Sequence, residues 1–564
     1  MTSVEWRHAL GATGLLRTFT DAEVIESSDV HVAQRLTALA KEPDETVALA
    51  VALVVRALRN GSVCMDLRAV EQQVSVDGLP WPGVDSWLAA VRRSPLAGQP
   101  AVVHVEGDLV YLDRYWLEEQ QVCGDVLRMV AARPGQASGD IDRLFPAGFE
   151  EQRAAAELAL SRGLTVLTGG PGTGKTTAVA RILALIIIGS RRLRIALAAP
   201  TGKAAARLQE AVRLEVANLD PADRAALSGL QATTLHRLLG SRPDSSARFR
   251  HNRGNRLPHD VIVVDETSMV SLTMMARLLE AVRPDAQLIF VGDPDQLASV
   301  EAGAVLADLV DGLGEDKVAA LKTSHRFGAS IGALASAIRA GDADRVIEVL
   351  RGGDEHIDWI NTEQPAGHLR KVVVPHALRL RRAAVLGDRE SALATLGEHR
   401  LLCAHRRGPF GVRYWNRQVE RWLAEDTGEP IWSAWYVGRP VLVTANDYGL
   451  GLYNGDAGVA VLDDGVLRAV IAGAAETLEF ATSRLAEVDT MHAMTIHKSQ
   501  GSQADEVTVL LPPEDSRLLT RELFYTAVTR AKERVRVIGS EAAVRTAIER
   551  RVLRASGLRQ RLRE

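Results

Sequence analysis

The stretch of this chain that most constrains its fold is Thr165–Thr177, which reads TVLTGGPGTGKTT. A short apolar strand pattern comes first, then a glycine-rich turn, and then a helical pattern that continues to Leu183. Glycines let a backbone curl so that several N–H groups point at one anion, and a helix start adds partial positive charge. Lys175 can reach the β- and γ-phosphates, and the Thr176 hydroxyl can coordinate Mg²⁺. The stretch therefore predicts binding of a nucleoside triphosphate.

Length and composition indicate several domains and exclude some kinds of protein. The chain has 564 residues, of which 46% are hydrophobic and 24% charged, with a net charge of −4. This charge neither favours nor excludes nucleic acid, because a protein can bind it in a local groove. Three distant cysteines without a CxxC pair predict a reducing compartment and no metal–thiolate site. Without a signal-peptide pattern or an apolar run of ~20 residues, a cytoplasmic protein is expected.

Two further strand patterns end in residues that ATP hydrolysis would need. Asp265 and Glu266 follow the apolar run Val261–Val264. Asp265 is expected to hold Mg²⁺ together with Thr176, and Glu266 to orient or deprotonate the attacking water. Gln296 lies beyond a third strand, where it can sense the γ-phosphate. Together with the glycine loop, these residues predict hydrolysis of the nucleotide and not binding alone.

Three residues outside these strand ends extend the predicted nucleotide site. Gln152, on a helix before the first strand, could bind the adenine edge with its amide donor and acceptor, although a solvated glutamine is the alternative. Arg326 comes soon after the first sheet. Arg530 is expected to point into the nucleotide cleft from the second half of the chain. An arginine there stabilises charge on the transferring phosphoryl group.

Other loop-to-helix segments are candidates for nucleic-acid contacts. Thr201 and Lys203 begin one such segment, and His236 lies in a comparable one. Ligands of parallel sheets lie at the carboxyl ends of strands, where these loops are expected. For Lys203, a solvated lysine at a helix start is a serious alternative. Basic residues around an Asn-Arg-Gly-Asn turn predict a small projecting hairpin near 245–258, which could be only a surface loop.

Seven motifs in order resemble those of superfamily 1 DNA helicases, from about residue 152 to residue 538: GGPGTGKTT, APTGKAAARL, VVDETSM, VGDPDQL, SHRF, TIHKSQG and YTAVTRAK. Their variants are similar to the 5′-to-3′ branch and, within it, to the RecD family, the alpha subunits of exodeoxyribonuclease V. Residues 57–67 and 112–116 resemble the N-terminal region of that family. The resemblance implies two RecA-like motor domains with ATP and Mg²⁺ between them and single-stranded DNA across their tops.

The same resemblance implies roles for individual residues. By the family's pattern, Gln152 contacts adenine, and Arg326 and Arg530 act as arginine fingers. The residues expected to hold the phosphates are Gly169, Gly170, Pro171, Gly172, Thr173, Gly174, Lys175, Thr176 and Thr177. The residues at positions where the family contacts DNA are Thr201, Lys203, His236, His497 and Ser499.

The implied fold class is α/β, with two RecA-like parallel-sheet motor domains, a small inserted SH3-like β-barrel and a mainly helical N-terminal domain. Residues 1–115 are expected to form a subunit-docking domain, for which a packing appendage is the alternative. Residues 116–330 are expected to form the first motor domain. Residues 331–564 are expected to form the second, with the barrel near 425–488. The arginine-rich tail after Glu541 is expected to be a solvated helix.

The implied function is ATP-dependent 5′-to-3′ translocation along single-stranded DNA from duplex ends, in a heterotrimer with RecB-like and RecC-like subunits that processes double-strand breaks. The protein would then work at the nucleoid, without membrane association, and the nuclease would lie in another chain. Two alternatives remain open: an autonomous helicase, marked by unwinding by the isolated chain, and a nucleotide-switched regulatory subunit, marked by ATP turnover insensitive to DNA. The second motor half argues against a small-molecule kinase.

Overall fold

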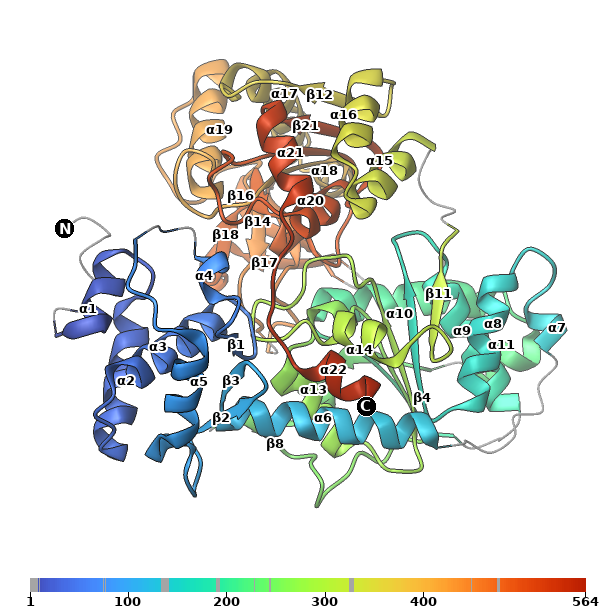
Figure 1. The fold of residues 1–564 in the computed structure, drawn as a ribbon. Coiled ribbons are helices and arrows are strands. Elements are labelled where there is room, and N and C mark those ends of the chain that lie inside the picture. The colour runs from blue at the N-terminus through green and yellow to red at the C-terminus, as the bar shows by residue number, and fades with distance from the viewer. Residues whose placement is uncertain are drawn as a thin grey trace.

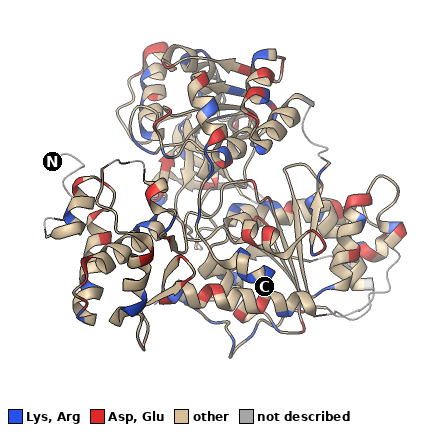
Figure 2. Cartoon of the chain, in the orientation of Figure 1, with Lys and Arg blue, Asp and Glu red and all other residues tan. Residues whose placement is uncertain are grey.

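The computed structural model describes the whole chain except residues 1–8, 10, 75, 77, 133–140, 189–192, 228, 243–244, 324–328, 448 and 474–476. The N-terminal domain, in blue, lies beside the first motor domain, and the second motor domain lies above both (Figure 1). Acidic and basic residues are interspersed over all three parts (Figure 2). Among the described helices, none is long and apolar enough to cross a membrane.

The N-terminal domain is mainly helical, as predicted. Its helix α3 (Glu45–Arg59) is apolar on nearly every side and is enclosed, with Leu49, Ala50 and Leu53 inaccessible to solvent. Asp44 begins this helix by accepting a hydrogen bond from the Thr46 N–H at 2.8 Å. The elements around α3 are α1 (Gly14–Asp21), α2 (Ser27–Ala40), α4 (Val70–Gln73), α5 (Val84–Arg93) and the sheet β1 (Met65–Asp66), β3 (Leu109–Leu112) and β2 (Val103–Glu106).

The first motor domain is built on a parallel sheet of six strands in the order β11-β4-β10-β9-β5-β6. These strands are β4 (Leu164–Gly169), β5 (Ile195–Ala199), β6 (Ala232–Thr234), β9 (Val261–Val264), β10 (Gln287–Gly292) and β11 (Val318–Leu321). In register, Gly292 pairs with Thr168, and Val264 pairs with both Phe290 and Ala198. The carboxyl ends of the central strands therefore meet at one edge, as the sequence predicted for a ligand site.

Helices cover both faces of this sheet because alternate strand residues point to opposite sides. Leu167, Val263 and Ile289 pack against one group of helices, whereas Val166 and Phe290 pack against the other. The first group comprises α8 (Glu150–Ser161), α9 (Lys175–Ile188) and α10 (Gly202–Ala217). The second comprises α6 (Asp113–Ala131), α13 (Leu272–Ala281) and α14 (Val305–Leu313).

The second motor domain repeats the design with a parallel sheet in the order β12-β21-β20-β13-β19. Its strands are β12 (Ile357–Ile360), β13 (His399–Cys403), β19 (Ala493–Thr495), β20 (Ala504–Leu510) and β21 (Ala531–Ile538). Its helices are α15 (Ala329–Ala340), α16 (Ala343–Gly352), α17 (Ala366–Val385), α18 (Arg389–Glu398), α19 (Val412–Thr427), α20 (Arg521–Val528) and α21 (Glu541–Glu549).

A separate antiparallel sheet is inserted between α19 and β19, close to the predicted 425–488. Its order is β17-β16-β15-β14-β18. The strands are β14 (Pro440–Val443), β15 (Ala457–Asp463), β16 (Val466–Ala472), β17 (Thr477–Ala481) and β18 (Val488–Thr490). Because the recorded pairings join the described strands in one open row, the closed SH3-like barrel stays a prediction.

The basic segment near 245–258 contains part of a two-stranded hairpin, and its projection from the domain stays a prediction. Its strands are β7 (Ser241–Arg242) and β8 (Ser245–Phe249), and a tight turn with reciprocal Asn252–Asn255 backbone hydrogen bonds of 3.0 Å follows. Arg253 in this turn donates to the Asp125 carboxylate of α6 at 2.9 Å. This ion pair holds the turn on the first motor domain.

The end of the chain exposes Arg551, Arg559 and Arg563, as expected for a solvated face, but it leaves the second motor domain, which was expected to extend to residue 564. After α21 the chain leaves the second motor domain, and its last helix α22 (Leu558–Arg563) packs against α14 and α6 of the first (Figure 1). Leu558 and Leu562 are buried there. Burial of these two leucines holds one face of α22 on the first motor domain, while Arg559 and Arg563 remain exposed.

Candidate nucleotide and nucleic-acid site

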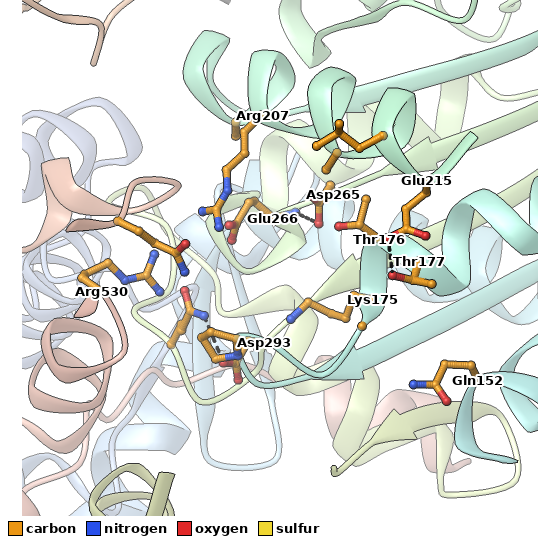
Figure 3. Close-up of a pocket in the computed structure, with 18 of the residues that line it drawn as sticks. Gln152, Lys175, Thr176, Thr177, Arg207, Glu215, Asp265, Glu266, Asp293 and Arg530 are labelled. Atoms are coloured by element: carbon orange, nitrogen blue, oxygen red, sulfur yellow. Dashed lines mark hydrogen bonds between the residues drawn. The ribbon is translucent and has the colours of Figure 1, made fainter. Parts of the chain in front are cut away.

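A cavity of about 540 Å³ lies at the carboxyl ends of the first sheet, and the second motor domain contributes Gln503 and Arg530 to its lining (Figure 3). It brings together most of the predicted nucleotide-site residues: Gln152, Pro171, Gly172, Gly174, Lys175, Thr176, Thr177, Asp265, Glu266, Gln296 and Arg530. Arg326 lies outside the described residues. The cavity therefore joins residues separated by more than half of the chain, as motif order predicted.

The glycine loop between β4 and α9 has the backbone conformation that its sequence predicts. Gly172 and Gly174 have φ angles of +83° and +82°, a region that side chains strongly disfavour. A Cβ atom on Gly169 would lie only 2.5 Å from the Thr173 hydroxyl. The Lys175 ammonium donates to the carbonyls of Gly169 and Gly170, at 2.6 and 2.9 Å. The lysine is thus positioned over the loop in which phosphates are expected.

Gln152 supports this loop directly. It is 3% exposed on α8, and its amide nitrogen donates to the Thr173 carbonyl at 3.3 Å. This hydrogen bond fixes the loop against α8, so Gln152 is not the solvated glutamine of the alternative interpretation. Binding of adenine by Gln152 stays a prediction.

Asp265 and Glu266 lie side by side where β9 ends. The Glu266 N–H donates to the Asp265 carboxylate at 2.8 Å, and Glu266 adopts a left-handed φ of +51°. A glutamate in that region carries strain that surrounding structure must offset, and such strain is often found at functional sites. Burial, reinforced by the neighbouring Glu266 charge, raises the pKa of Asp265 to about 6. A cation at this point would favour the ionised carboxylate.

Gln296 is part of a hydrogen-bonded group that spans the two motor domains. Its amide nitrogen donates to Asp293 at 3.0 Å, and the Tyr525 hydroxyl of α20 donates to the same carboxylate oxygen at 3.1 Å. The next residue, Leu297, donates its N–H to the Thr526 hydroxyl at 2.9 Å. The side-chain amide oxygen of Gln296 is buried and has no hydrogen-bond partner among the described residues. It can accept a hydrogen bond from a group bound in the cavity.

Arginines from both domains approach the two carboxylates (Figure 3). Arg530 is 3% exposed and is held by the Thr526 carbonyl at 3.0 Å. Burial lowers its pKa, whereas the charge of Glu266 acts in the opposite direction. Arg207 of α10 reaches toward Glu266 from the first motor domain (Figure 3). The cavity therefore carries positive charge on both sides of the point where phosphates are expected.

Sequence reasoning missed several residues that help to build this cavity. Arg207 was inside a quoted motif, four positions after Lys203, but helical spacing alone gives it no target. Asp293 and Tyr525 were also within motifs, yet their contact joins residues far apart in sequence. Glu215 accepts from the Thr177 hydroxyl at 2.9 Å and had no sequence signal.

The five residues predicted to contact DNA fall into two groups. The hydroxyls of Thr201 and Ser499 bond to local backbone: Thr201 caps α10 by accepting from Ala204 at 3.2 Å, and Ser499 donates to Ile496 at 2.6 Å. These two residues shape their loops, and a direct DNA contact stays a prediction.

The other three predicted DNA contacts, Lys203, His236 and His497, have side chains with nitrogen atoms in place of hydroxyls. Lys203 lines an interdomain hollow of about 320 Å³ with Arg400 and Asp456, and burial lowers its pKa to about 8. His236 is exposed on α12 (Leu235–Leu239), and its ring packs on Phe249 at 5.8 Å. Burial also lowers the pKa of His497. Lys203 thus lies between the motor domains and is not simply solvated.

Family models match three separate parts of the chain. One described as the RecBCD enzyme subunit RecD, N-terminal domain, matches residues 21–104. An AAA domain model matches residues 152–302, and a UvrD-like helicase C-terminal domain model matches residues 490–538. The matches fall in the N-terminal, first motor and second motor domains respectively.

Two curated relatives are also described as RecBCD enzyme subunit RecD. RecBCD enzyme subunit RecD of Mycolicibacterium smegmatis is 72% identical over 97% of this chain and 99% of its own length. That of Mycobacterium tuberculosis is 65% identical over 100% of this chain and 99% of its own. A solved structure of Pif1 helicase from Bacteroides with ADP-AlF3 and ssDNA is 18% identical over 69% of this chain and 91% of its own, with a TM-score of 0.40. By identity over almost its full length, the chain belongs to the RecD family of RecBCD enzyme subunits.

Proposed function

We propose that this chain is an ATP-driven 5′-to-3′ DNA helicase that acts as one subunit of a RecBCD-type complex, with RecB-like and RecC-like partners. Its substrates are single-stranded DNA and duplex ends. One observation carries the proposal: the nucleotide cavity is lined by Lys175 and Asp265 from one motor domain and by Arg530 from the other. A ligand there contacts both domains, so its binding and hydrolysis can change how they sit together.

The residues in the cavity fit a nucleotide with Mg²⁺. Thr176 and Asp265 line the same cavity and offer the oxygen ligands that Mg²⁺ prefers. The side-chain amide oxygen of Gln296 supplies a buried acceptor that is unpaired within the described parts of the chain. Bound Mg²⁺ would neutralise charge on the phosphates. Gln152 remains positioned to contact the base beside the loop.

The chain's own residues supply the remaining chemistry. Lys175, now held by two loop carbonyls, turns toward the β- and γ-phosphates when they bind. Glu266 accepts a proton from the water that attacks the γ-phosphate. Arg530 stabilises the charge that develops on the transferring phosphoryl group. Arg326 is proposed as a second arginine finger on motif grounds alone.

Hydrolysis is coupled to movement through contacts beside the γ-phosphate position. The Tyr525–Asp293 and Leu297–Thr526 hydrogen bonds join the motor domains, and Gln500 adds a third at 2.7 Å to the Leu297 carbonyl. When these contacts break and re-form, the two domains bind the strand alternately. Thr201, Lys203, His236, His497 and Ser499 are proposed along that strand.

The N-terminal domain is proposed as the docking module for the partner subunits. Its exposed apolar side chains include Leu39 and Val32 on α2, which are 66% and 38% exposed. Val32 and Leu39 are seven positions apart and therefore lie on one face of α2, which we propose faces a partner subunit. We also propose that residues 1–115, 116–330 and 331–550 act as the three functional domains, with α22 belonging to the first motor domain.

The test combines purification with unwinding. The tagged chain, expressed with its native partners, is expected to copurify with two large subunits, and the complex is expected to unwind 5′-tailed duplexes with ATP. Lys175→Gln should leave the complex intact and remove this subunit's 5′-to-3′ movement. Unwinding by the isolated chain without partners would indicate the autonomous helicase instead. ATP turnover that single strands do not stimulate would indicate a nucleotide-switched subunit.

A further inference from the structure

A hollow of about 600 Å³ on the second motor domain has an unusual lining. It lies along α19 and the loop that precedes it, and no acidic residue occurs among its described lining residues. The side chains that matter for the argument are Arg407, Arg413, Tyr414, Arg417, Gln418 and Arg421. We call this hollow the arginine groove. Elsewhere on the molecule, acidic and basic residues are interspersed (Figure 2).

The helix geometry makes the arginines of the groove a continuous row. Arg413, Arg417 and Arg421 are spaced by four residues, so they lie on one face of α19 and extend over about 12 Å. All three are exposed. Tyr414 lies in the same groove and is 45% exposed, although a tyrosine ring usually buries most of its surface. The row therefore combines repeated positive charge with an accessible aromatic ring.

The guanidinium groups of this row form no recorded ion pair or hydrogen bond with described residues, unlike most arginines of the molecule. Acidic residues on α19 are engaged elsewhere. Glu425 and Asp426 pair with Arg370 at 2.9 and 2.5 Å. Glu420 accepts a hydrogen bond from the Tyr436 hydroxyl at 3.2 Å, and burial raises its pKa while the nearby charges of Arg439 and Arg417 oppose that shift. The positive charge of the groove thus remains available to a ligand from outside the chain.

The arginine groove is continuous with the face on which DNA contacts are predicted. Arg413 also lines a neighbouring hollow of about 120 Å³, which contains Arg406, Thr495 and Lys498. Thr495 and Lys498 belong to the TIHKSQG motif, next to His497 and Ser499. A strand held at that motif can therefore continue into the groove without crossing an acidic surface, apart from Asp489, which pairs with Lys498 at 3.2 Å.

We propose that the arginine groove binds the phosphate backbone of single-stranded nucleic acid as it passes over α19, with Tyr414 stacking on a base. Single strands are favoured because a basic groove with an accessible aromatic ring matches their phosphates and unpaired bases. A surface that binds an acidic protein needs the positive charge but does not need an exposed ring such as that of Tyr414. The proposal rests on the proposed function and extends the DNA site to residues outside the motifs.

Salt dependence of binding tests the arginines. Fluorescein-labelled oligo(dT) is titrated with the full-length chain at several salt concentrations. Each lost phosphate contact lowers the slope of log K against log salt by about 0.7 for single strands, so Arg417→Gln/Arg421→Gln is expected to lower it by about 1.4. The control, Arg345→Gln/Arg379→Gln, removes the same charge from surface arginines that pair with Glu348 and Glu398. Its slope should equal that of the natural chain.

A second pair of variants tests the stacking. Tyr414→Ala is expected to weaken oligo(dT) binding by about fivefold or more, because base–aromatic stacking contributes at least that much. Tyr414→Phe keeps a ring of the same shape and should restore the affinity. A tyrosine that served only to pack against Trp415, its neighbour at 5.1 Å, would show equal DNA affinity in all three chains.

The outcomes separate this inference from the proposed function. An unchanged salt slope in Arg417→Gln/Arg421→Gln, with normal DNA-stimulated ATP hydrolysis, overturns the groove and leaves the function standing. Loss of copurifying subunits with an unchanged slope also overturns it and assigns the groove to a protein partner. If the natural chain itself binds no single strand, the proposed function fails as well. Circular dichroism melting of each variant confirms that folding is retained.

Discussion

At the residue scale, the nucleotide site depends on two adjacent carboxylates that repel each other and on the positive side chains that surround them. Asp265 and Glu266 place two carboxylates together, and Glu266 does so in a strained left-handed conformation. Arg207 and Arg530 surround these acids with positive charge (Figure 3). In the chain alone, the Lys175 ammonium donates to the Gly169 and Gly170 carbonyls. A phosphate bound in the loop therefore competes with these carbonyls for the lysine ammonium.

Lys175→Gln is expected to reduce DNA-stimulated ATP hydrolysis by about 10²-fold or more, because a preorganised charge at the transferring phosphate is lost. The free energy of unfolding should change little, since water can replace the lysine as the donor to the Gly169 and Gly170 carbonyls. Lys371→Gln on α17 is a matched control, because this lysine is exposed and remote from the cavity. Hydrolysis rates with and without oligo(dT) check both; full turnover in Lys175→Gln would contradict the assigned site.

Asp308 on α14 gives a prediction about pH. Burial, together with the charge of Glu119, raises its pKa to about 7 from an ordinary 3.8, although a hydrogen bond from Ser556 opposes the shift. The folded chain therefore keeps a proton that the unfolded chain loses, and stability falls as pH rises from about 4 to 7. Asp308→Asn should remove this part of the decline, so its gain in stability should be larger at pH 7 than at pH 4. Urea unfolding at both pH values measures the difference; an equal gain would contradict the shift.

At the scale of elements, the last segment of the chain joins the domains that its sequence separates. The Glu119 carboxylate of α6 accepts hydrogen bonds from the Tyr111 hydroxyl of β3, from Ser556 and Gly557 before α22, and from Arg561 within it, at 2.7 to 3.3 Å. Glu119 is fully buried. One carboxylate therefore links the N-terminal domain, the first motor domain and the tail.

Glu119→Ala is expected to destabilise the protein by about 3–5 kcal/mol, because it leaves Arg561 and several buried donors without their shared acceptor. Glu118→Ala, one position earlier on the same helix, is a useful comparison. Glu118 pairs with the exposed Arg114 at 3.3 Å and accepts from Thr273 at 2.7 Å. Its loss should cost less. Denaturant unfolding measures the loss of stability in both variants. Equal losses would contradict the special role of Glu119.

The contrast between Asp265 and Glu119 shows what the sequence could predict. Asp265 follows a strand of four apolar residues, and Lys175 follows a glycine loop, so local pattern places both at the sheet edge. The parallel sheets and the inserted antiparallel strands were predictable for the same reason. Glu119, Arg207 and the Asp293–Tyr525 contact depend on packing between distant segments. Local periodicity reports only on residues near one another in sequence, so it predicts neither these contacts nor the return of α22 to the first motor domain.

At the scale of the whole molecule, the two motor domains are held closed by contacts that flank the nucleotide cavity. Tyr525 and Thr526 of α20 bond to the loop after β10, and Gln500 bonds to the same loop. The tail adds a second connection, because Val552 bonds to Glu522 while Ala555 bonds to Val63 of the N-terminal domain. Opening of the motor domains must break the first set of contacts, whereas the tail can remain attached to the first motor domain as a tether.

Tyr525→Phe is therefore expected to shift the domains toward the open state. The lost hydrogen bond to Asp293 contributes about 0.5–1.5 kcal/mol, which corresponds to a rise in KM for ATP of about two- to tenfold. Because Tyr525 is argued to act on closure and not on the reacting atoms, kcat with saturating ATP and DNA should change much less. Tyr436→Phe is the control: its hydroxyl bonds to Glu420 and His492 within the second motor domain, so KM should stay unchanged. A fall in kcat without a rise in KM would instead make Tyr525 part of the chemical step and would contradict its role in closure.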